Sequence, residues 1–289
     1  MSSVRQLAKT IIPSRYYSLL QRSYRKVRQF VLYHRAAKAI RYFGISHYCP
    51  ICKSHLRRFL AFGVKPRPNA LCPVCGSLER HRLLWLFMHQ RTNLFSPPRT
   101  RMLHAAPLPC LTSMFQKREV IDYISTDLAP YADLQMDLTS ICFADEVFDV
   151  VLASHVEVFD VVLASHVLEH IVDDRKAMRE ISRVLKTDGW AILQVPINAE
   201  VTYEDPSIEN PIERERVFGQ FDHVRIYGKD YYDRLREAGF TVHREKLPTQ
   251  LNQSTVHRLG LLQDEEIILC TKALTGPFES CLASPAKPR

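Results

Sequence analysis

Two hydrophobic periods alternate over the carboxyl-terminal two thirds of the chain. Residues 159–165 form a short apolar run rich in β-branched side chains, as in strands buried inside a parallel sheet. Apolar residues then recur at helical spacing over Ala177–Leu185, and Asp188–Gly189 ends that pattern. A second apolar run follows at Trp190–Ile197. This order predicts a strand–helix–strand unit, and hence an α/β fold.

The same patterns predict further elements on both sides of this unit. They indicate strands in residues 101–107, 123–127, 136–138, 240–243 and 266–270, the first including the turn after it. Helical spacing predicts helices over residues 77–87 and 229–238, the second ended by Gly239. The segment Asn198–Gly228 is left as a long insertion with mixed charged and aromatic residues. Such a loop in a compact domain is usually functional.

An eleven-residue segment, Glu146–Val156, is repeated without change as Glu157–Val167. Either copy would present the same side chains to a sheet, so local propensity does not choose between them. If the first copy were the strand, the extra residues would fall at the carboxyl edge of the sheet, where ligands bind in open α/β folds. We therefore expect the second copy to be the strand and the first to be extruded as a loop.

Four of the eight cysteines form two C-x2-C pairs separated by nineteen residues. The four are Cys49, Cys52, Cys72 and Cys75. This spacing predicts a tetrahedral zinc site, and a closed set of four thiolates makes the zinc structural and not catalytic. The alternative is buried unligated cysteines or two disulfides. A zinc site of this kind implies a reducing compartment.

The segments FDVVLASHVLEH and RVLKTDGWAILQVP resemble the fourth strand, and the helix, turn and fifth strand, of class I S-adenosylmethionine-dependent methyltransferases. The resemblance implies a Rossmann-like fold with a seven-stranded mixed sheet, helices on both faces and an antiparallel final strand pair. A small zinc-ribbon-like module would precede it. The resulting division is a basic segment (1–48), a zinc module with a bridging helix (49–90), a methyltransferase domain (98–273) and a disordered tail (274–289).

The resemblance implies S-adenosylmethionine as the cofactor and indicates where it binds. The turn after the first strand has no glycine, but its alanines are small enough for close approach of the backbone. An acid after the second strand is suited to the ribose hydroxyls, and one after the third to the adenine amino group. Each acid taken alone is more often a solvated turn residue. The predicted cofactor-binding residues are His104, Ala105, Ala106, Asp127, Asp137, Ser165 and His166.

Candidate catalytic residues come from two places in the sequence. Ser165, His166, Glu169 and His170 follow the predicted fourth strand, where the methyl group would meet the acceptor. In the insertion, Asp222 and His223 are candidates for a general base and the carboxylate beside it, because a carboxylate can orient a histidine that accepts a proton. The alternatives are a structural role for His223 and a pocket-lining role for His166. The predicted catalytic residues are His223, Asp222 and His166.

Positive charge is concentrated at the amino terminus. Residues 1–48 contain ten lysines and arginines and no acid, whereas 29 basic and 31 acidic residues nearly balance in the remainder. Leu20, Tyr24, Val27 and Val31 have helical spacing within this segment. The alternatives are a helix packed on the domain, an anchor at an anionic membrane surface, a nucleic-acid arm and a transit peptide.

The functional hypothesis is O-methylation of a small-molecule or glycan hydroxyl by a cytoplasmic, zinc-containing enzyme, with peripheral membrane contact through residues 1–48 as an option. No apolar run is long enough to span a bilayer. One rival is an RNA methyltransferase that holds RNA with the zinc module and the basic arm. It is disfavoured because the zinc segment lacks interleaved aromatic residues for base stacking. The other rival is a binding or scaffold protein that retains the fold without activity.

Overall fold

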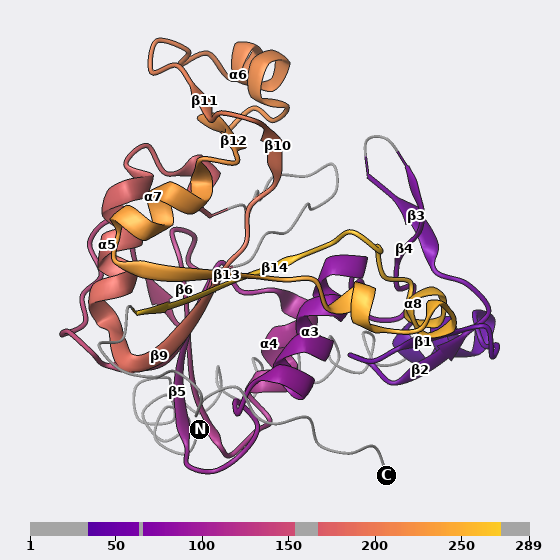
Figure 1. The fold of residues 1–289 in the computed structure, drawn as a ribbon. Coiled ribbons are helices and arrows are strands. Elements are labelled where there is room, and N and C mark those ends of the chain that lie inside the picture. Colours follow the sequence, from indigo (N-terminus) through magenta and orange to yellow (C-terminus); the bar gives the residue numbers. More distant parts are fainter. Residues whose placement is uncertain (1–33, 64–65, 154–166, 273–289) are drawn as a thin grey trace, which may run out of the picture.

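A seven-stranded mixed sheet organises the chain (Figure 1). The computed structural model describes residues 34–63, 66–153 and 167–272. The strands lie in the order β13 (Phe240–Glu245), β14 (Ile267–Lys272), β9 (Leu185–Leu193), β8 (Phe148–Ala153), β5 (Thr100–Ala105), β6 (Ile121–Asp127) and β7 (Leu134–Gln135). Only β14 runs antiparallel to its neighbours. The predicted Rossmann-like class I architecture, including the antiparallel final pair, is confirmed.

Helices cover both faces of the sheet and divide the core in two. On one face pack α3 (Glu79–Arg91) and α4 (Pro109–Phe115), and on the other α5 (Asp174–Val184) and α7 (Tyr231–Glu237). Along β8, Val150 and Leu152 join the first core while Val151 and Ala153 join the second. This alternation is the period of two that a β-strand imposes on its side chains. Because both faces are covered, the strand reads as a continuous apolar run.

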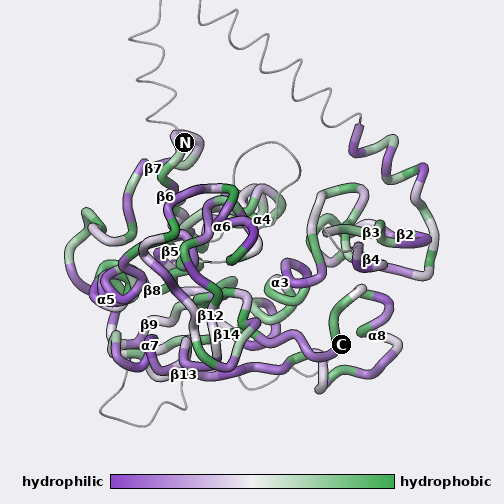
Figure 2. Tube along the Cα trace, turned by 90° about the horizontal axis from the view of Figure 1, so that it is seen from above, coloured by the Kyte–Doolittle hydropathy of each residue, from purple (hydrophilic) through white to green (hydrophobic). Residues whose placement is uncertain are grey.

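The four-cysteine segment forms a small module beside the sheet, with α3 between the two (Figures 1 and 2). It contains two hairpins, β1 (His47–Cys49) with β2 (Ser54–Leu56) and β3 (Leu60–Phe62) with β4 (Arg67–Leu71). The short elements η2 (Leu247–Gln250) and α8 (Gln253–Leu259) return from β13 to this side, and α8 contacts β1. Residues distant in sequence therefore enclose the module.

The strand between β5 and β9 is formed by the first copy of the duplication, so the expectation that the second copy forms it was wrong. The residues before the first copy are already anchored to α5. Ile141 N–H donates to Glu180, and Arg183 donates to the carbonyl oxygens of Ile141 and Phe143. Val147 N–H then bonds the Val184 carbonyl. These contacts deliver the chain to the sheet at Phe148, so the additional residues come after the strand in the sequence.

The insertion after β9 forms a small subdomain at the top of Figure 1. It comprises β10 (Ile197–Ala199), β11 (Tyr203–Glu204), α6 (Pro211–Phe218) and β12 (Arg225–Gly228), and its three strands pair in the order β10-β12-β11. A 3-10 turn, η1 (Leu168–His170), contacts β12. The structure differs from expectation at a second place. Strand β9 begins at Leu185 and continues through Asp188–Gly189, where the helical pattern was predicted to end.

The predicted amphipathic helix of the basic segment and the predicted disordered tail lie outside the described residues. Residues 34–41, the described end of the basic segment, are helical. Within the described parts of the chain, no helix has the length and apolar character required to cross a bilayer.

Candidate active site

The carboxyl ends of β5, β6 and β7 bring three predicted cofactor positions to one edge of the sheet. The three strands are parallel neighbours. Ala106 directly follows β5, Asp127 ends β6, and Asp137 comes two residues after β7. Ligands bind at this edge in open α/β sheets. The three residues are thus gathered where the sequence predicted a nucleoside cofactor.

The turn after β5 keeps a glycine-like conformation without a glycine. Ala106 has φ +50°, in the left-handed region that favours glycine, and its N–H donates to the Thr126 carbonyl at 2.9 Å. Ala105 and Ala106 are both buried. A small side chain is the least costly substitute at such a position, because a larger one would fill the space in front of the turn.

His104 is part of the protein interior. Its side chain is fully buried, Nδ1 lies 2.9 Å from the Tyr123 hydroxyl, and Nε2 accepts from the Leu108 N–H at 3.4 Å. Burial lowers the pKa of His104 to about 3, so the imidazole is neutral at physiological pH. With both ring nitrogens engaged, a cofactor contact at this position can come only from the main chain.

The two predicted acidic ligands have different surroundings. Asp127 is half-buried, and its carboxylate accepts from the Ala129 N–H at 2.9 Å and from the Tyr131 hydroxyl. Asp137 is exposed and accepts from the Thr139 N–H at 2.8 Å. The hydroxyl of Tyr131 already bonds Asp127 as a ribose hydroxyl would. A bound nucleoside would compete with Tyr131 for that carboxylate.

A cluster of two histidines and an aspartate joins the insertion to the edge beyond β8. His170, Asp222 and His223 each offer a donor atom, and the three atoms lie within 4.8 Å of one another. His170 Nδ1 is 3.1 Å from the Asp222 carbonyl oxygen and 3.3 Å from its carboxylate. The two imidazoles meet edge to face, with ring centroids 4.8 Å apart. His223 is buried and the other two are half-buried.

The charge of Asp222 is stabilised by its neighbours. Burial alone would raise the pKa of its carboxyl, but the hydrogen bond from His170, together with the charges of His170 and His223, holds that pKa below its ordinary value. The carboxylate is therefore ionised at neutral pH. It can orient an imidazole or bind a cation.

The insertion is fixed to η1 by main-chain contacts. Val224 N–H donates to the Glu169 carbonyl at 2.9 Å. Arg225 is buried, and its guanidinium donates to the carbonyl oxygens of Leu168 and Ile171 at 3.0 and 2.6 Å. These bonds place Asp222 and His223 against His170, although some fifty residues separate them in the sequence.

The four predicted zinc ligands converge. Their donor atoms lie within 4.8 Å of one another, with Sγ–Sγ distances of 3.6 Å for Cys49–Cys75 and 3.7 Å for Cys52–Cys72. A tetrahedral zinc ion with Zn–S bonds of about 2.3 Å requires S–S separations of about 3.8 Å. All four are free thiols and not disulfides. The residues present therefore fit a four-thiolate metal site.

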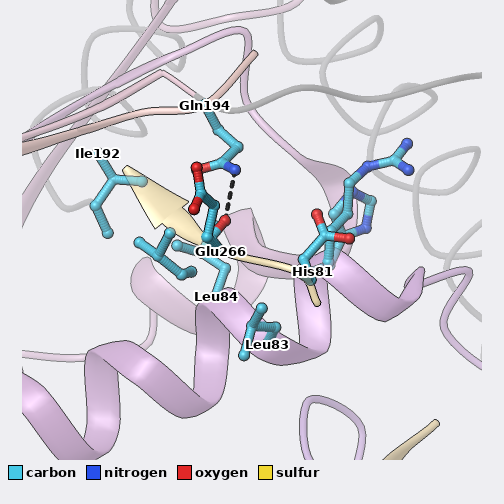
Figure 3. A pocket seen from close by; sticks show the side chains of 9 residues that line it. His81, Leu83, Leu84, Ile192, Gln194 and Glu266 are labelled. Atoms are coloured by element: carbon cyan, nitrogen blue, oxygen red, sulfur yellow. Dashed lines mark hydrogen bonds between the residues drawn. The ribbon is translucent and has the colours of Figure 1, made fainter. Parts of the chain in front are cut away.

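A cleft lies between α3 and the ends of β9 and β14 (Figure 3). Figure 3 labels His81, Leu83, Leu84, Ile192, Gln194 and Glu266 in its wall. Arg80 and Glu265 also line it, and burial raises the pKa of the Glu265 carboxyl. His81 Nδ1 is 3.7 Å from Cys110 Sγ at the start of α4, so the cleft adjoins the turn after β5.

Comparison with known proteins agrees with this architecture. Residues 110–245 match a family model described as "Methyltransferase domain". Within these residues the chain contains a methyltransferase domain. The match runs from α4 to β13 and so includes Asp127, Asp137 and the His170–Asp222–His223 cluster. No curated protein sequence matches the chain.

Several solved structures are similar to the methyltransferase domain. The YcgJ protein of Bacillus subtilis is 15% identical over 66% of this chain and 98% of that chain, with a TM-score of 0.40. The 1,6-didemethyltoxoflavin-N1-methyltransferase of Burkholderia thailandensis, solved with 1,6-didemethyltoxoflavin and S-adenosylhomocysteine, is 14% identical over 60% and 71% of the two chains, with a TM-score of 0.39. The assignment of the fold rests on the strand order and not on these similarities.

Apart from the interior residue His104, the predicted site residues of the methyltransferase domain fall into three groups. Ala105, Ala106, Asp127 and Asp137 gather at the carboxyl edge. Asp222 and His223 meet each other and His170. Ser165 and His166 lie outside the described residues, as do Ser154 and His155, the corresponding residues of the first copy.

Some residues of the site were candidates from the sequence that were not among the predicted catalytic residues, and others were not predicted at all. His170 was one of four polar candidates after the fourth strand, and it is the described histidine that meets Asp222. Of the polar residues in the first turn of α3, Arg80 and His81 line the cleft, whereas Glu79 pairs with Arg67 at 2.7 Å. Gln194 and Glu265 were missed. A polar residue at the carboxyl end of an apolar strand, as in Ala-Ile-Leu-Gln194, was the available signal.

Proposed function

We propose that this methyltransferase transfers a methyl group from S-adenosylmethionine to a hydroxyl oxygen of a small-molecule or glycan acceptor. The observation that carries the proposal is the His170–Asp222–His223 cluster at the edge beyond β8. An aliphatic or sugar hydroxyl is a poor nucleophile until its proton is removed. A cluster of imidazoles around an ionised carboxylate promotes that loss near neutral pH.

The cofactor, when bound, supplies a methyl group on a positively charged sulfur. Asp127 would accept hydrogen bonds from the ribose hydroxyls, and Asp137 would accept one from the adenine amino group. The small turn at Ala105–Ala106 allows the main chain to approach the rest of the molecule. In the transfer itself, the acceptor oxygen forms a bond to the methyl carbon, the carbon–sulfur bond breaks, and the hydroxyl proton leaves through the cluster.

The proposal includes a structural zinc ion held by Cys49, Cys52, Cys72 and Cys75. Four thiolates complete a tetrahedral set and leave no position for substrate, so the ion would stabilise the module without taking part in the chemistry. Hydrogen bonds within the module support this assignment: the Ser77 hydroxyl lies 3.4 Å from Cys49 Sγ and 3.2 Å from Cys75 Sγ. The test is the zinc content of the purified full chain, compared between the wild type and Cys72→Ser.

Peripheral contact with an anionic membrane is also proposed for the basic segment. At its described end, Ile40, Phe43 and Ile45 are 79, 66 and 84% exposed, next to Lys38 and Arg41. Exposed apolar side chains beside cations are the elements of an interfacial anchor. The full chain should sediment with phosphatidylserine vesicles and not with phosphatidylcholine vesicles. Equal sedimentation by a chain lacking residues 1–45 would refute this proposal.

Calorimetric titration of the zinc-loaded full chain with S-adenosylmethionine tests the cofactor site. We expect Asp127→Ala to weaken binding at least tenfold, because the ribose hydroxyls lose their acceptor. Asp122→Ala is the matched control, since Asp122 lies on the same strand but pairs with Arg99 and Arg101 on the surface. Equal binding by wild type and Asp127→Ala would contradict the proposed site.

A chain with one copy of the duplication is the second control. Deleting either copy produces the same sequence, so the choice of copy does not affect the result. Binding by the shortened chain but not by the full chain would mean that the duplication disables the site. If neither chain binds S-adenosylmethionine, the methyltransferase proposal fails and a non-catalytic binding protein is favoured.

Transfer of labelled methyl groups to hydroxylated small molecules, glycans and RNA tests the acceptor. The proposal predicts labelling of an oxygen, with the rate strongly reduced in Asp222→Asn while S-adenosylmethionine binding is retained. Labelling of RNA in preference to the other acceptors would overturn the assigned acceptor class.

A further inference from the structure

The His170–Asp222–His223 cluster has the composition of a metal site as well as of an acid–base group. Two imidazoles and one carboxylate come from two separate segments, η1 and the residues before β12, and meet within 4.8 Å. Two histidines and one carboxylate on one side of an ion leave other coordination positions open. The cluster differs in this respect from the four-cysteine site, whose donor set is closed.

The histidines are oriented by the main chain in the manner of metal ligands. His170 Nδ1 is 3.1 Å from the Asp222 carbonyl oxygen, and His223 Nδ1 is 3.3 Å from that of Phe218. A carbonyl oxygen can only accept, so each Nδ1 carries a proton, and in the neutral form of each ring the lone pair is on Nε2. A metal-binding histidine almost always donates its other N–H to such a partner, which fixes the ring and its tautomer.

Charge and burial at the cluster favour a cation. The Asp222 carboxylate is half-buried and lies 3.3 Å from His170 Nδ1. His223 is only 6% exposed, and the side chains of His170 and Asp222 are 16 and 27% exposed. A site with this access is screened from bulk water but open to a ligand. Both features raise the affinity of neutral imidazoles and a carboxylate for a divalent ion.

We propose that His170, Asp222 and His223 hold a divalent transition-metal ion that binds the oxygen of the acceptor. The inference rests on the proposed methyl transfer and specifies how its hydroxyl is activated. Two nitrogen ligands select manganese, iron, cobalt or zinc over magnesium and calcium, which prefer oxygen. An acceptor with two adjacent oxygen atoms fits best, since it can fill two open positions.

The ion changes where the hydroxyl proton goes. A water molecule or hydroxyl bound to a divalent metal ion loses its proton to solvent near neutral pH, so no free imidazole is required. The resulting oxygen anion forms the bond to the methyl carbon as the carbon–sulfur bond breaks, and the bonding pair remains on sulfur. The two histidines then serve as ligands, and the metal site and the zinc module are chemically distinct.

Manganese binding to the zinc-loaded full chain tests the proposal. Equilibrium dialysis, together with loss of the free Mn²⁺ electron paramagnetic resonance signal, should reveal one bound ion beyond the zinc. Asp222→Asn and His223→Gln should each weaken Mn²⁺ binding at least tenfold. Asp205→Asn is the control, because Asp205 is an acidic residue of the same insertion that instead accepts from Ser207.

Two further measurements keep the outcomes distinct. Retained zinc and an unchanged circular dichroism spectrum show that a variant is folded. If a variant is misfolded, an NMR titration of the wild type with diamagnetic zinc takes the place of that variant. The imidazole nitrogen resonances of His170 and His223 are then expected to shift. Absence of a second ion, or equal Mn²⁺ binding by wild type and Asp222→Asn, overturns the metal site. Methyl transfer at full rate without a second ion also overturns it, and leaves the proposed methyltransferase function standing.

Discussion

Buried arginines secure both the zinc module and the insertion, but their countercharges differ. Arg82 is fully buried in α3 and donates to five main-chain carbonyl oxygens, those of Asn69, Ala70, Ser77, Leu259 and Gly260. Arg225 and Arg234 instead reach carboxylates. Arg234 bonds Asp174 and Glu204 at 3.0 Å each, and Arg225 bonds Glu204 at 2.7 Å.

We infer that folding of the four-cysteine module depends on the zinc ion proposed for it, whereas the insertion is anchored by its ion pairs. Burial lowers the pKa of Arg82, and the nearby thiolates of Cys49 and Cys72 oppose that shift. Burial also acts against the charge of Arg234, but Glu204 and Asp174 raise its pKa above the ordinary value. The charge of Arg82 is thus offset only in part by the cysteine cluster and Glu79, whereas Arg234 is paired with Glu204 of the insertion and Asp174 of α5.

Removal of zinc should separate the two regions most clearly. Structural zinc contributes on the order of 10 kcal/mol to folding of small zinc domains, so a strong chelator should unfold the module. Hydrogen exchange would then show loss of protection in β1–β4 while β10–β12 stay protected. Readdition of zinc is the control for reversibility. Equal loss of protection in both regions would refute the distinction.

Substitution of Arg82 should have the next largest effect. Arg82→Met removes a buried cation and leaves several carbonyl oxygens without a donor, which should lower the free energy of unfolding by about 4 kcal/mol. Arg91→Met, on the same helix but at its surface end, should change it by less than about 1 kcal/mol. Urea denaturation of the zinc-loaded proteins measures both. A loss of similar size in the two variants would contradict the anchoring role of Arg82.

Asp174→Asn tests the insertion anchor. Asp174 is 3% exposed and accepts from Arg234 and from the Tyr227 hydroxyl at 2.8 Å. Neutralising it leaves a buried arginine partly uncompensated, and we expect a loss of about 3 kcal/mol. This variant should retain zinc. Loss of zinc from Asp174→Asn would show that the two anchors are coupled.

The smallest effect on stability is expected at the exposed surface of α5 and α7. Arg175 and Glu237 pair at 2.7 Å, but their side chains are 43 and 62% exposed. Solvent screens such a pair, so Glu237→Gln should lower the free energy of unfolding by no more than about 0.5 kcal/mol. Thermal unfolding of Asp174→Asn beside Glu237→Gln compares a buried and an exposed carboxylate on adjacent helices. A larger loss of stability in Glu237→Gln than in Asp174→Asn would contradict the stabilising role of the buried carboxylate.

The sheet and the cysteine cluster were predictable because their signals are local. Runs such as Trp190–Leu193 carry the period of buried strands, and the two C-x2-C pairs place thiolates together by their spacing alone. Asp127 and Asp137 were expected at the carboxyl edge of the sheet for the same reason, since each comes at or after the end of a predicted strand, and both lie there. The start of β9 was not predictable, because a register irregularity opposite Asp149 carries the strand through Asp188–Gly189.

The candidate acceptor site was only partly predictable. Asp222 and His223 were selected as a pair from adjacency, but the partner chosen beside them, His166, is outside the described residues. His170 meets them because Val224 and Arg225 bond the carbonyl groups of η1. Such contacts join residues some fifty positions apart and leave no periodic pattern in the sequence.

The duplicated segment shows which features local sequence signals cannot predict. Hydrophobic period and cysteine spacing act over a few residues, and they were enough to predict the α/β class and the four-thiolate cluster. Two identical copies have the same local preferences, so only long-range contacts of Ile141–Val147 with α5 decided that the first enters the sheet. The same holds for Arg82 and for His170, whose partners come from distant segments, because burial and charge compensation are properties of the assembled chain.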